Sequence, residues 1–347
     1  MTNDQCKFVE ALRTSLTSGM TADSSLIIGV SGGADSVALL RGIRLLGDEL
    51  HLTPIAVHVN HQLRGAESDQ DSAWVQELCQ RLEVRCEIVP VDVAERAAAR
   101  SIGIEEAARD ARYDALQTIA EQLNVSIIAL AHNADDQIET ALHHLLRGTG
   151  LAGLKGMPSS RSLSDRVHII RPLLSVRRAE IERFLQSLDQ DFRSDSSNQD
   201  TSLTRNFLRH ELLPLLEQRL NPQVREHLLR LTQQAGEWHE VLQLQAGKLL
   251  KAALLDESPT VVRLRCDPFA DQPRPLVREA FVLLWTSHAW PRQAMTFAHW
   301  DALADLALSD QSTSINLPGN KTCLRRGGLL AIECRRSRNL PAHGTNA

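Results

Sequence analysis

The feature that most constrains the fold is a short polar string that directly follows an apolar run. The run is LIIGV, at Leu26–Val30, and the string is SGGADS, at residues 31–36. An uninterrupted apolar run of this length predicts a strand that is buried on both faces of a sheet. The two glycines permit a tight turn and a close approach to an anion, because glycine has no Cβ. The sequence therefore predicts a strand, a phosphate-binding loop and a helix, in that order.

Strands and helices continue to alternate through the first half of the chain. Further apolar runs at Ile55–Val59, Glu87–Val91 and Ile127–Leu130 predict strands. Helical stretches are expected at residues 35–46, 67–82, 104–123 and 134–146. Strands that alternate with helices favour βαβ units and a parallel sheet. The predicted fold class is therefore α/β, with a parallel-sheet domain at its start.

The second part of the chain has a different pattern. The glycines of RGTGLAGLKG and the polar stretch 159–166 interrupt the alternation. Beyond them, helices are expected at 176–188, 204–220 and 223–256, and a short β-like tail at 314–317 and 329–333 around the turn PGN. Proline and asparagine residues near 214–222 mark a boundary. We therefore predict a catalytic domain at 1–218 and a mostly helical domain with a β-like tail at 219–347.

Composition limits where such a chain works. The chain has 347 residues, of which 43% are hydrophobic and 23% charged, as in soluble globular proteins. Neither a signal peptide nor an apolar run of the ~20 residues that a membrane span needs is visible. The six cysteines contain no C-x-x-C pair. A cytoplasmic protein with reduced cysteines is expected. The net charge of −5 argues mildly against general nucleic-acid affinity, but it leaves room for a local basic face.

The polar string itself indicates which phosphate loop this is. It lacks the lysine of a Walker A loop and the spacing of the dinucleotide-binding glycines. Asp35 would repel phosphate unless a cation lay between them, so it indicates Mg²⁺ bound together with ATP. An ordinary capped turn is the alternative. The predicted nucleotide-binding residues are Ser31, Gly32, Gly33, Ala34, Asp35 and Ser36. The string resembles the PP-loop of ATP pyrophosphatases, which implies cleavage of ATP between the α and β phosphates.

A second group of polar residues follows the fourth predicted strand. His132 ends that strand, and Asp136 and Glu139 lie three residues apart, on one face of the next helix. Helix capping is an alternative role for acids at this position, above all for Asp135. Upstream, Arg109 and Arg112 share a helix face and suit a triphosphate, although Glu105 offers Arg109 a plain surface ion pair.

Seven strings, in this order, resemble those of tRNA(Ile)-lysidine synthetases. They are SGGADS, HVNHQLRG (58–65), EEAARDARY, AHNADDQIET, RGTG, RPLL (171–174) and DSSN…TRNFLRHELLP, and they span about residues 26–220. The last third of the chain resembles the helical domain of this family only loosely. The resemblance implies an adenine nucleotide alpha hydrolase-like PP-loop domain followed by a tRNA-binding domain.

The resemblance also implies a two-step ligation. The wobble cytidine of a CAU-anticodon tRNA(Ile) attacks the α-phosphate of ATP through its O2 oxygen and releases pyrophosphate. The ε-amine of free L-lysine then displaces AMP at carbon 2 and gives lysidine, so that the tRNA reads AUA. The implied catalytic residues are Asp35, Arg112, His132 and Asp136, with Asp35 on Mg²⁺ through ATP, Asp136 and Glu139 on lysine, and Arg64, Arg205, Asn206 and Arg209 on tRNA. A homodimer is left open.

Three other functions stay open at this point. A PP-loop tRNA 2-thiolase typically carries paired or catalytic cysteines, for which an isolated Cys79 or Cys86 is a poor substitute. The DDQIET and DSSN…RN strings do not resemble those of small-molecule PP-loop ligases. A non-catalytic adenine-nucleotide-binding module needs the loop but has no use for the group formed by His132, Asp136 and Glu139.

Overall fold

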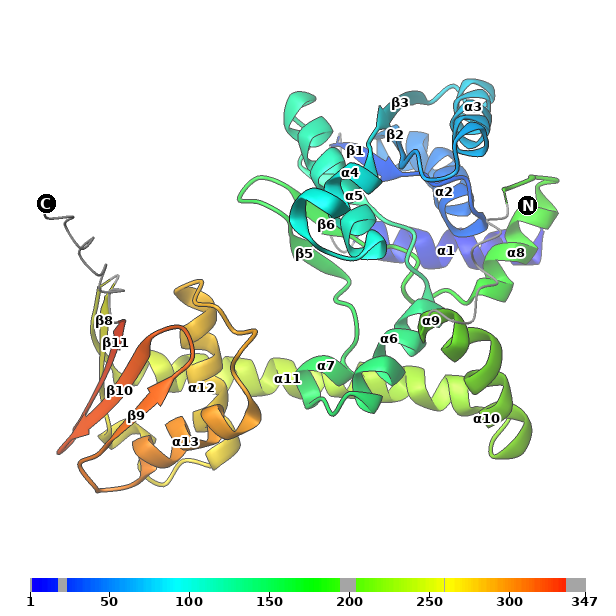
Figure 1. The fold of residues 1–347 in the computed structure, drawn as a ribbon. Coiled ribbons are helices and arrows are strands. Elements are labelled where there is room, and N and C mark those ends of the chain that lie inside the picture. Colours follow the sequence, from blue (N-terminus) through cyan, green and yellow to red (C-terminus); the bar gives the residue numbers. More distant parts are fainter. Residues whose placement is uncertain (1, 18–23, 194–203, 259, 335–347) are drawn as a thin grey trace, which may run out of the picture. The chain divides into compact units, whose positions relative to one another are not determined.

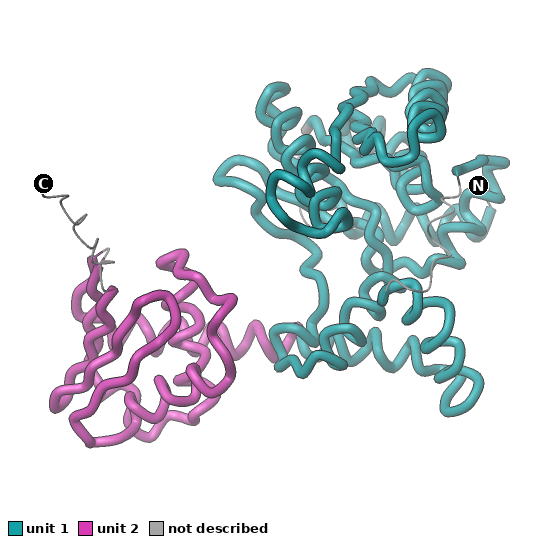
Figure 2. Tube along the Cα trace, viewed as in Figure 1, with its two compact units in different colours: residues 1–235 teal, residues 236–347 magenta. Residues whose placement is uncertain are grey.

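The computed structural model describes residues 2–17, 24–193, 204–258 and 260–334 (Figure 1). The chain divides into two compact units, Met1–Ala235 and Gly236–Ala347 (Figure 2). The predicted boundary at 218/219 lies beside the turn that precedes helix α11 (Val224–Ala253), whereas the units divide later, inside this helix. The reason is tertiary packing, since Leu228 and Leu229 at the start of α11 pack on apolar residues of the first unit.

The first unit contains a six-stranded sheet with the order β3-β2-β1-β4-β6-β5. Its strands are β1 (Ser24–Gly29), β2 (Leu52–Asn60), β3 (Arg85–Pro90), β4 (Ile127–Ala129), β5 (Ser160–Ser162) and β6 (His168–Ile170). All neighbours pair in parallel except β5, which runs antiparallel to β6. The predicted parallel sheet is confirmed. The last two strands were not predicted, because each is three residues long and β5 lies in the polar stretch.

The helices of the first unit up to residue 187 are α1 (Asn3–Thr17), α2 (Ala34–Leu50), α3 (Ala66–Arg81), α4 (Val93–Arg100), α5 (Ile104–Gln122), α6 (Ala134–Leu146), α7 (Leu151–Leu154) and α8 (Arg178–Ser187). Helices α1, α2, α3 and α8 cover one face of the sheet and α5 covers the other, with α4 packed on α5. Helix α6 packs instead on α7 and on the segment that contains Leu208 and Leu213. Ile28 of β1 belongs to a core shared with α1, α2, α3 and α8, whereas its neighbour Ile27 packs with residues of α5 on the opposite face (Figure 1). Successive side chains of a strand point to opposite faces, so a strand covered on both sides must be apolar throughout.

The first unit ends in a helical segment of mixed type. Helix α9 (Thr204–Phe207) runs into a π-helical stretch, Leu208–Leu212, and then into α10 (Leu213–Arg219). The stretch widens where Pro214 cannot donate a backbone hydrogen bond, and the Leu213 N–H bonds the Leu208 carbonyl instead. Leu208 and Leu213 are buried against Ile138 of α6. The predicted helix at 204–220 is therefore present but irregular, and it is anchored to α6.

The second unit combines helices α12 (Arg274–Ser287) and α13 (Phe297–Leu308) with an antiparallel sheet. The strands are β7 (Leu254–Glu257), β8 (Val261–Arg265), β9 (Ser314–Leu317), β10 (Lys321–Arg326) and β11 (Leu329–Cys334), in the order β7-β8-β11-β10-β9. The predicted tail strands form part of this larger sheet. Residues 254–256 were predicted as helix, and this was wrong because pairing with β8 overrides local helix propensity. Within the described ranges, no helix is long and apolar enough to cross a membrane.

Candidate nucleotide and substrate site

The site lies at the carboxyl ends of two adjacent central strands. Strand β1 pairs with β2 on one side and β4 on the other, so the chain connections diverge between β1 and β4. Such a switch point is where open parallel sheets bind ligands. The predicted phosphate loop follows β1, and His132 with Asn133 follows β4. Two polar groups more than 90 residues apart in the chain thus meet at one sheet edge.

The loop has the backbone that its two glycines permit. Gly32 has a φ of +92°, a region that side chains with a Cβ rarely adopt, and Gly33 precedes α2 without a side-chain cap. The Ser36 hydroxyl accepts the Ser31 N–H at 3.1 Å and donates to the Gly33 carbonyl at 2.9 Å. The first N–H groups of α2 are therefore available to an anion, with the helix dipole behind them.

Arg193 holds this loop from the outside, a role that the sequence did not indicate. Its backbone N–H donates to the Gly32 carbonyl at 2.9 Å, and its Nε donates to Asp71 Oδ1 at 2.8 Å. Arg193 begins the polar string RSDSSNQDTS, between the helices predicted at 176–188 and 204–220, and nothing in this string indicates such a contact. The Asp195–Asn198 string of the resemblance lies outside the described residues.

A cavity of about 480 Å³ opens beside the loop. Its lining includes the predicted residues Ser31, Asp35, Ser36, Arg64, Arg112 and His132. This volume falls within the range of ligand pockets. His58 and His61, at and just beyond the end of β2, also line it and were not assigned a role from sequence. Burial lowers the pKa of His58, and that of His61 to about 4, so both rings are neutral near pH 7.

Asp35 is the unsatisfied group of the loop. Its Oδ1 is buried and has no hydrogen-bond partner among the described residues. Burial, followed by the charge of Asp136, raises the pKa of Asp35 to about 6. Over the described ranges, no group of three His, Cys, Asp or Glu side chains is arranged to hold a metal ion by itself. A cation at Asp35 would need further oxygen ligands, which a bound triphosphate carries.

Asp136 and Glu139 are already occupied by an arginine. Arg209 Nε donates to Glu139 Oε1 at 2.5 Å, and its Nη2 donates to Asp136 Oδ1 at 3.0 Å and Glu139 Oε2 at 3.1 Å. The other Asp136 oxygen, Oδ2, accepts the Asn133 N–H at 3.1 Å in a capping box. All four carboxylate oxygens therefore have partners. Glu139 is only 1% exposed, and burial raises its pKa.

Asp135, the third acid of this helix end, serves another purpose. It accepts the Arg178 backbone N–H at 2.9 Å, and both Arg177 and Arg225 form ion pairs with it, at 3.1 and 3.2 Å. These contacts join the start of α6 to the starts of α8 and α11. Asp135 is therefore a structural anchor, but it does not cap its own helix: the capping considered for it is carried out by Asn133 and Asp136.

His132 and Arg112 lie together on the cavity wall. Burial lowers the pKa of His132 to about 3, with Arg171, Arg112 and Arg205 adding to the effect, so the imidazole is neutral at physiological pH. Its Nδ1 and the Arg112 Nε are buried and have no hydrogen-bond partner among the described side chains. Both groups thus retain bonding capacity toward a ligand in the cavity.

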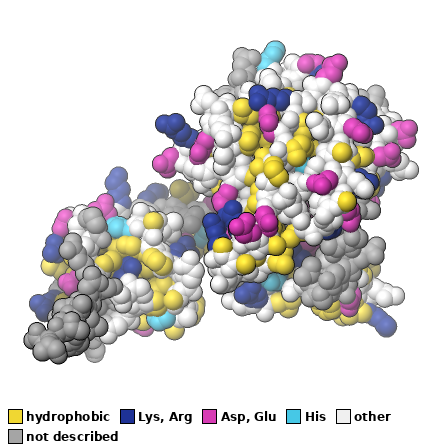
Figure 3. Space-filling view, turned by 45° about the horizontal axis from the view of Figure 1, so that its top comes forward, with side chains coloured by type: hydrophobic (Ala, Val, Ile, Leu, Met, Phe, Trp, Pro, Cys, Tyr) yellow, Lys and Arg dark blue, Asp and Glu magenta, His cyan; other side chains and the backbone are white. Residues whose placement is uncertain are grey.

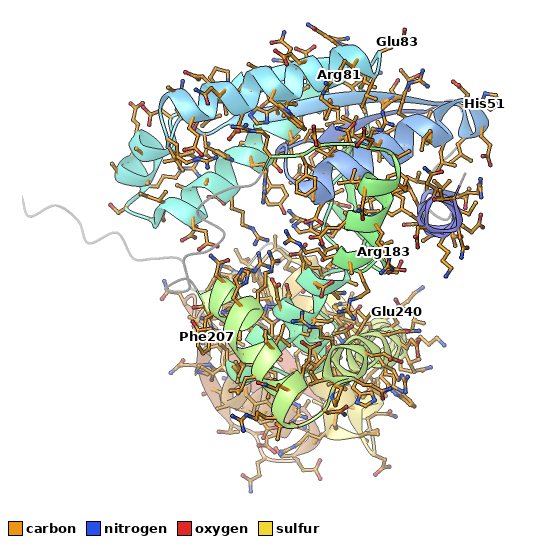
Figure 4. All side chains as sticks on the ribbon, turned by 90° about the vertical axis from the view of Figure 1, so that its right-hand side faces the viewer. His51, Arg81, Glu83, Arg183, Phe207 and Glu240 are labelled. Atoms are coloured by element: carbon orange, nitrogen blue, oxygen red, sulfur yellow. The ribbon has the colours of Figure 1, made fainter. Side chains whose placement is uncertain are left out.

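The residues predicted to contact tRNA lie in two places. Arg64 lines the cavity and pairs with Asp71 at 3.0 Å and Glu67 at 3.1 Å. Arg205 is exposed and donates to Thr140 of α6 at 3.2 Å. Asn206 is half-buried on α9, beside Phe207, which is 41% exposed and is labelled in Figure 4. Arg209 is the residue bound to the two carboxylates. Figure 3 shows basic and acidic side chains interspersed over the face that it presents.

These features define a class of protein. It is an α/β domain that binds the phosphates of a nucleotide with a glycine-containing loop, and this loop lacks the lysine of a Walker A motif. The family model described as PP-loop domain matches residues 3–216. A U34-tRNA thiolase of known structure from Methanococcus maripaludis has a similar fold, with a TM-score of 0.55 and 18% identity over 66% of this chain and 77% of that one.

Two sequence relatives narrow the class to a family. A tRNA(Ile)-lysidine synthase from Porphyromonas gingivalis is 45% identical over 208 residues, which are 60% of this chain and 44% of that protein. One from Rhodopirellula baltica is 34% identical over 330 residues, covering 85% of this chain and 82% of that protein. The chain therefore belongs to the tRNA(Ile)-lysidine synthase family of PP-loop proteins. It spans about half the length of several relatives, 44% and 57% in two cases.

Proposed function

We propose that the chain ligates the ε-amine of L-lysine to carbon 2 of the wobble cytidine in CAU-anticodon tRNA(Ile), with conversion of ATP to AMP and pyrophosphate. One observation carries the proposal. A phosphate loop in which Asp35 Oδ1 has no partner lies beside two carboxylates, the half-buried Asp136 and the buried Glu139, so that nucleotide and cationic substrate have sites at one sheet edge. Relatives named tRNA(Ile)-lysidine synthase support the proposed product.

The nucleotide side of the site suits ATP with Mg²⁺. The N–H groups at the start of α2 and the Ser31 hydroxyl bind phosphate oxygens. The unpartnered Asp35 Oδ1 fits one ligand position of Mg²⁺, and the cation, when bound, neutralises charge on the phosphates. Arg112 stabilises the charge that develops on the α-phosphate when the cytidine O2 attacks and pyrophosphate leaves. His132 stays neutral at this step and therefore offers a hydrogen bond without a charge.

The lysine side of the site requires an exchange of partners. Since Arg209 occupies three of the four carboxylate oxygens, the α-ammonium of lysine binds Asp136 and Glu139 by taking the place of this guanidinium. Arg209 is then free to bind a phosphate of the tRNA, as proposed from sequence. The ε-amine of the bound lysine attacks carbon 2 of the adenylated cytidine, and AMP leaves. Arg64, Arg205 and Asn206 complete the proposed tRNA contacts.

The direct test is mass analysis of nucleosides from unmodified CAU-anticodon tRNA(Ile) incubated with the protein, ATP, Mg²⁺ and lysine. Lysidine should form, with release of pyrophosphate that requires the tRNA. A tRNA(Ile) whose wobble cytidine is replaced by guanosine is the matched control and should give neither product. In a parallel reaction that is supplied with a sulfur donor, a sulfur-containing nucleoside would indicate a thiolase instead. Pyrophosphate release without RNA would indicate a small-molecule ligase. If no pyrophosphate is released under any of these conditions, the chain is a nucleotide-binding module without catalytic activity.

The proposed function also bears on the cellular location, the oligomeric state and the thiolase alternative. We propose the cytoplasm as the location, because tRNA, ATP and lysine are all available there. A homodimer stays a prediction. A thiolase role is disfavoured by the two candidate cysteines, since Cys79 is buried on α3 and Cys86 lies on β3, and neither lines the cavity.

A further inference from the structure

Four arginines surround the single tyrosine of the chain, Tyr113 of α5. The guanidinium carbons of Arg109 and Arg112 lie 5.7 Å from the centre of the Tyr113 ring, and that of Arg161, on β5, lies 4.7 Å from it. Arg171 follows directly after β6, and its positive charge acts on the same phenol. We call Arg109, Arg112, Arg161 and Arg171 the arginine cluster.

Acidic partners are missing from the cluster as far as the structure describes the chain. None of its members forms an ion pair with an aspartate or glutamate of the described residues. The two α5 acids in the middle of the helix, beside the arginines, are engaged elsewhere, since Asp110 pairs with Arg100 at 3.3 Å and Asp114 pairs with Arg96, both on α4. Helix α5 thus directs Asp110 and Asp114 to α4, and Arg109 and Arg112 to Tyr113. This separation leaves a local excess of positive charge in a chain whose net charge is −5.

Two cluster members are substantially removed from water. Arg171 is 4% exposed; its Nη1 donates to the Pro158 carbonyl at 2.8 Å, but its Nε has no partner among the described residues. The Arg112 Nε is also buried without a partner. Burial lowers the pKa of both guanidinium groups, which reflects the cost of a desolvated charge. Unpaired buried cations cost free energy, and an anion bound between them would offset this cost.

The position of the cluster indicates which anion this is. Arg112 lines the nucleotide cavity, whereas Arg109, Arg161 and Arg171 do not. The positive charge therefore extends from the α-phosphate side of the cavity past the ATP site. We propose that the three members of the arginine cluster outside the cavity, Arg109, Arg161 and Arg171, bind the backbone phosphodiester next to the target nucleotide of the RNA substrate, while Arg112 serves the α-phosphate. This inference rests on the proposed function, because the target base must reach the α-phosphate and bring its own backbone phosphates with it. Guanidinium forks match phosphate oxygens in pairs.

The test uses Arg161→Gln and Arg109→Gln, with Arg166→Gln as the matched control. Arg166 is exposed and lies in the connection between β5 and β6, five residues after Arg161 and outside the cluster. Two CAU anticodon stem-loop RNAs serve as probes: one natural, and one with uncharged methylphosphonate linkages on both sides of the target cytidine. Wild type and Arg166→Gln should lose about ten-fold or more in affinity when the linkages are uncharged, as expected for lost charge-assisted contacts.

Arg161→Gln and Arg109→Gln should bind the natural RNA about ten-fold more weakly than wild type does, with unchanged ATP affinity. These two variants should lose little further affinity when the linkages are uncharged, because their contact with the phosphodiester is already missing. The slope of log affinity against log salt should fall by ~0.7.

Equal RNA affinities for these variants and Arg166→Gln, in a protein that still forms lysidine, would overturn the inference and leave the proposed function intact. A loss of ATP or pyrophosphate affinity in place of RNA affinity would assign the cluster to the nucleotide and also overturn it. If the wild type neither bound the natural RNA nor formed lysidine, the proposed function itself would be wrong.

Discussion

Asp35→Asn should stabilise the ligand-free protein while it abolishes turnover. The pKa of Asp35 rises from 3.8 to about 6 on folding, chiefly through burial and then through repulsion by Asp136. Each pKa unit corresponds to 1.36 kcal/mol, so ionised Asp35 costs the fold about 3 kcal/mol at most. Between pH 3.8 and 6 the unfolded chain releases this proton and the folded chain retains it, so stability falls as the pH rises. Well above pH 6 the free energy of unfolding is reduced by the full cost of the ionised, buried carboxylate.

Urea unfolding at several pH values between 4 and 8 measures this effect. The stability of Asp35→Asn relative to wild type should increase from pH 4 to about pH 6.5 and then stay constant. Asp48→Asn is the matched control, because Asp48 is on the same helix with a 97% exposed side chain and should show no such change. In parallel, pyrophosphate release with ATP, Mg²⁺ and tRNA should be lost in Asp35→Asn only. Equal stability of Asp35→Asn and wild type at pH 8, or retained turnover with normal magnesium dependence, would refute the reasoning.

Three further predictions concern the substrates. Arg209→Gln should bind free lysine about ten-fold or more tightly than wild type in calorimetry without tRNA, since the competing guanidinium is gone; unchanged affinity would exclude the exchange of partners. Glu139→Gln should raise the KM for lysine by roughly ten- to hundred-fold while tRNA adenylation persists at low lysine. Loss of adenylation with normal lysine dependence would assign Glu139 to the nucleotide instead. Arg205→Ala should weaken tRNA binding and lower its salt slope by ~0.7–0.9 with ATP binding unchanged; identical affinity and slope would make Arg205 a bystander.

The sequence by itself determined the local elements of the PP-loop domain. A fully apolar run indicates a strand buried on both faces, and Ile27 and Ile28 of β1 indeed pack into cores on opposite faces. Gly32 adopts a φ of +92°, as a tight phosphate turn requires. Segments with helical periodicity between the short apolar runs predicted a parallel sheet, because adjacent parallel strands must be joined by long connections, which are usually helices. Each of these inferences depends on residues that are close together in the chain.

Only the tertiary structure decided how distant residues are paired. Arg209 meets Glu139 across 70 residues, and this contact changes a predicted open lysine site into one that must exchange partners. The second-unit sheet, and the short strands β5 and β6, likewise depend on pairing with distant segments. The physical reason is that burial and charge pairing are properties of the folded neighbourhood. Identical carboxylates, Asp135 and Asp136, become an anchor and a candidate ligand only through what packs against each.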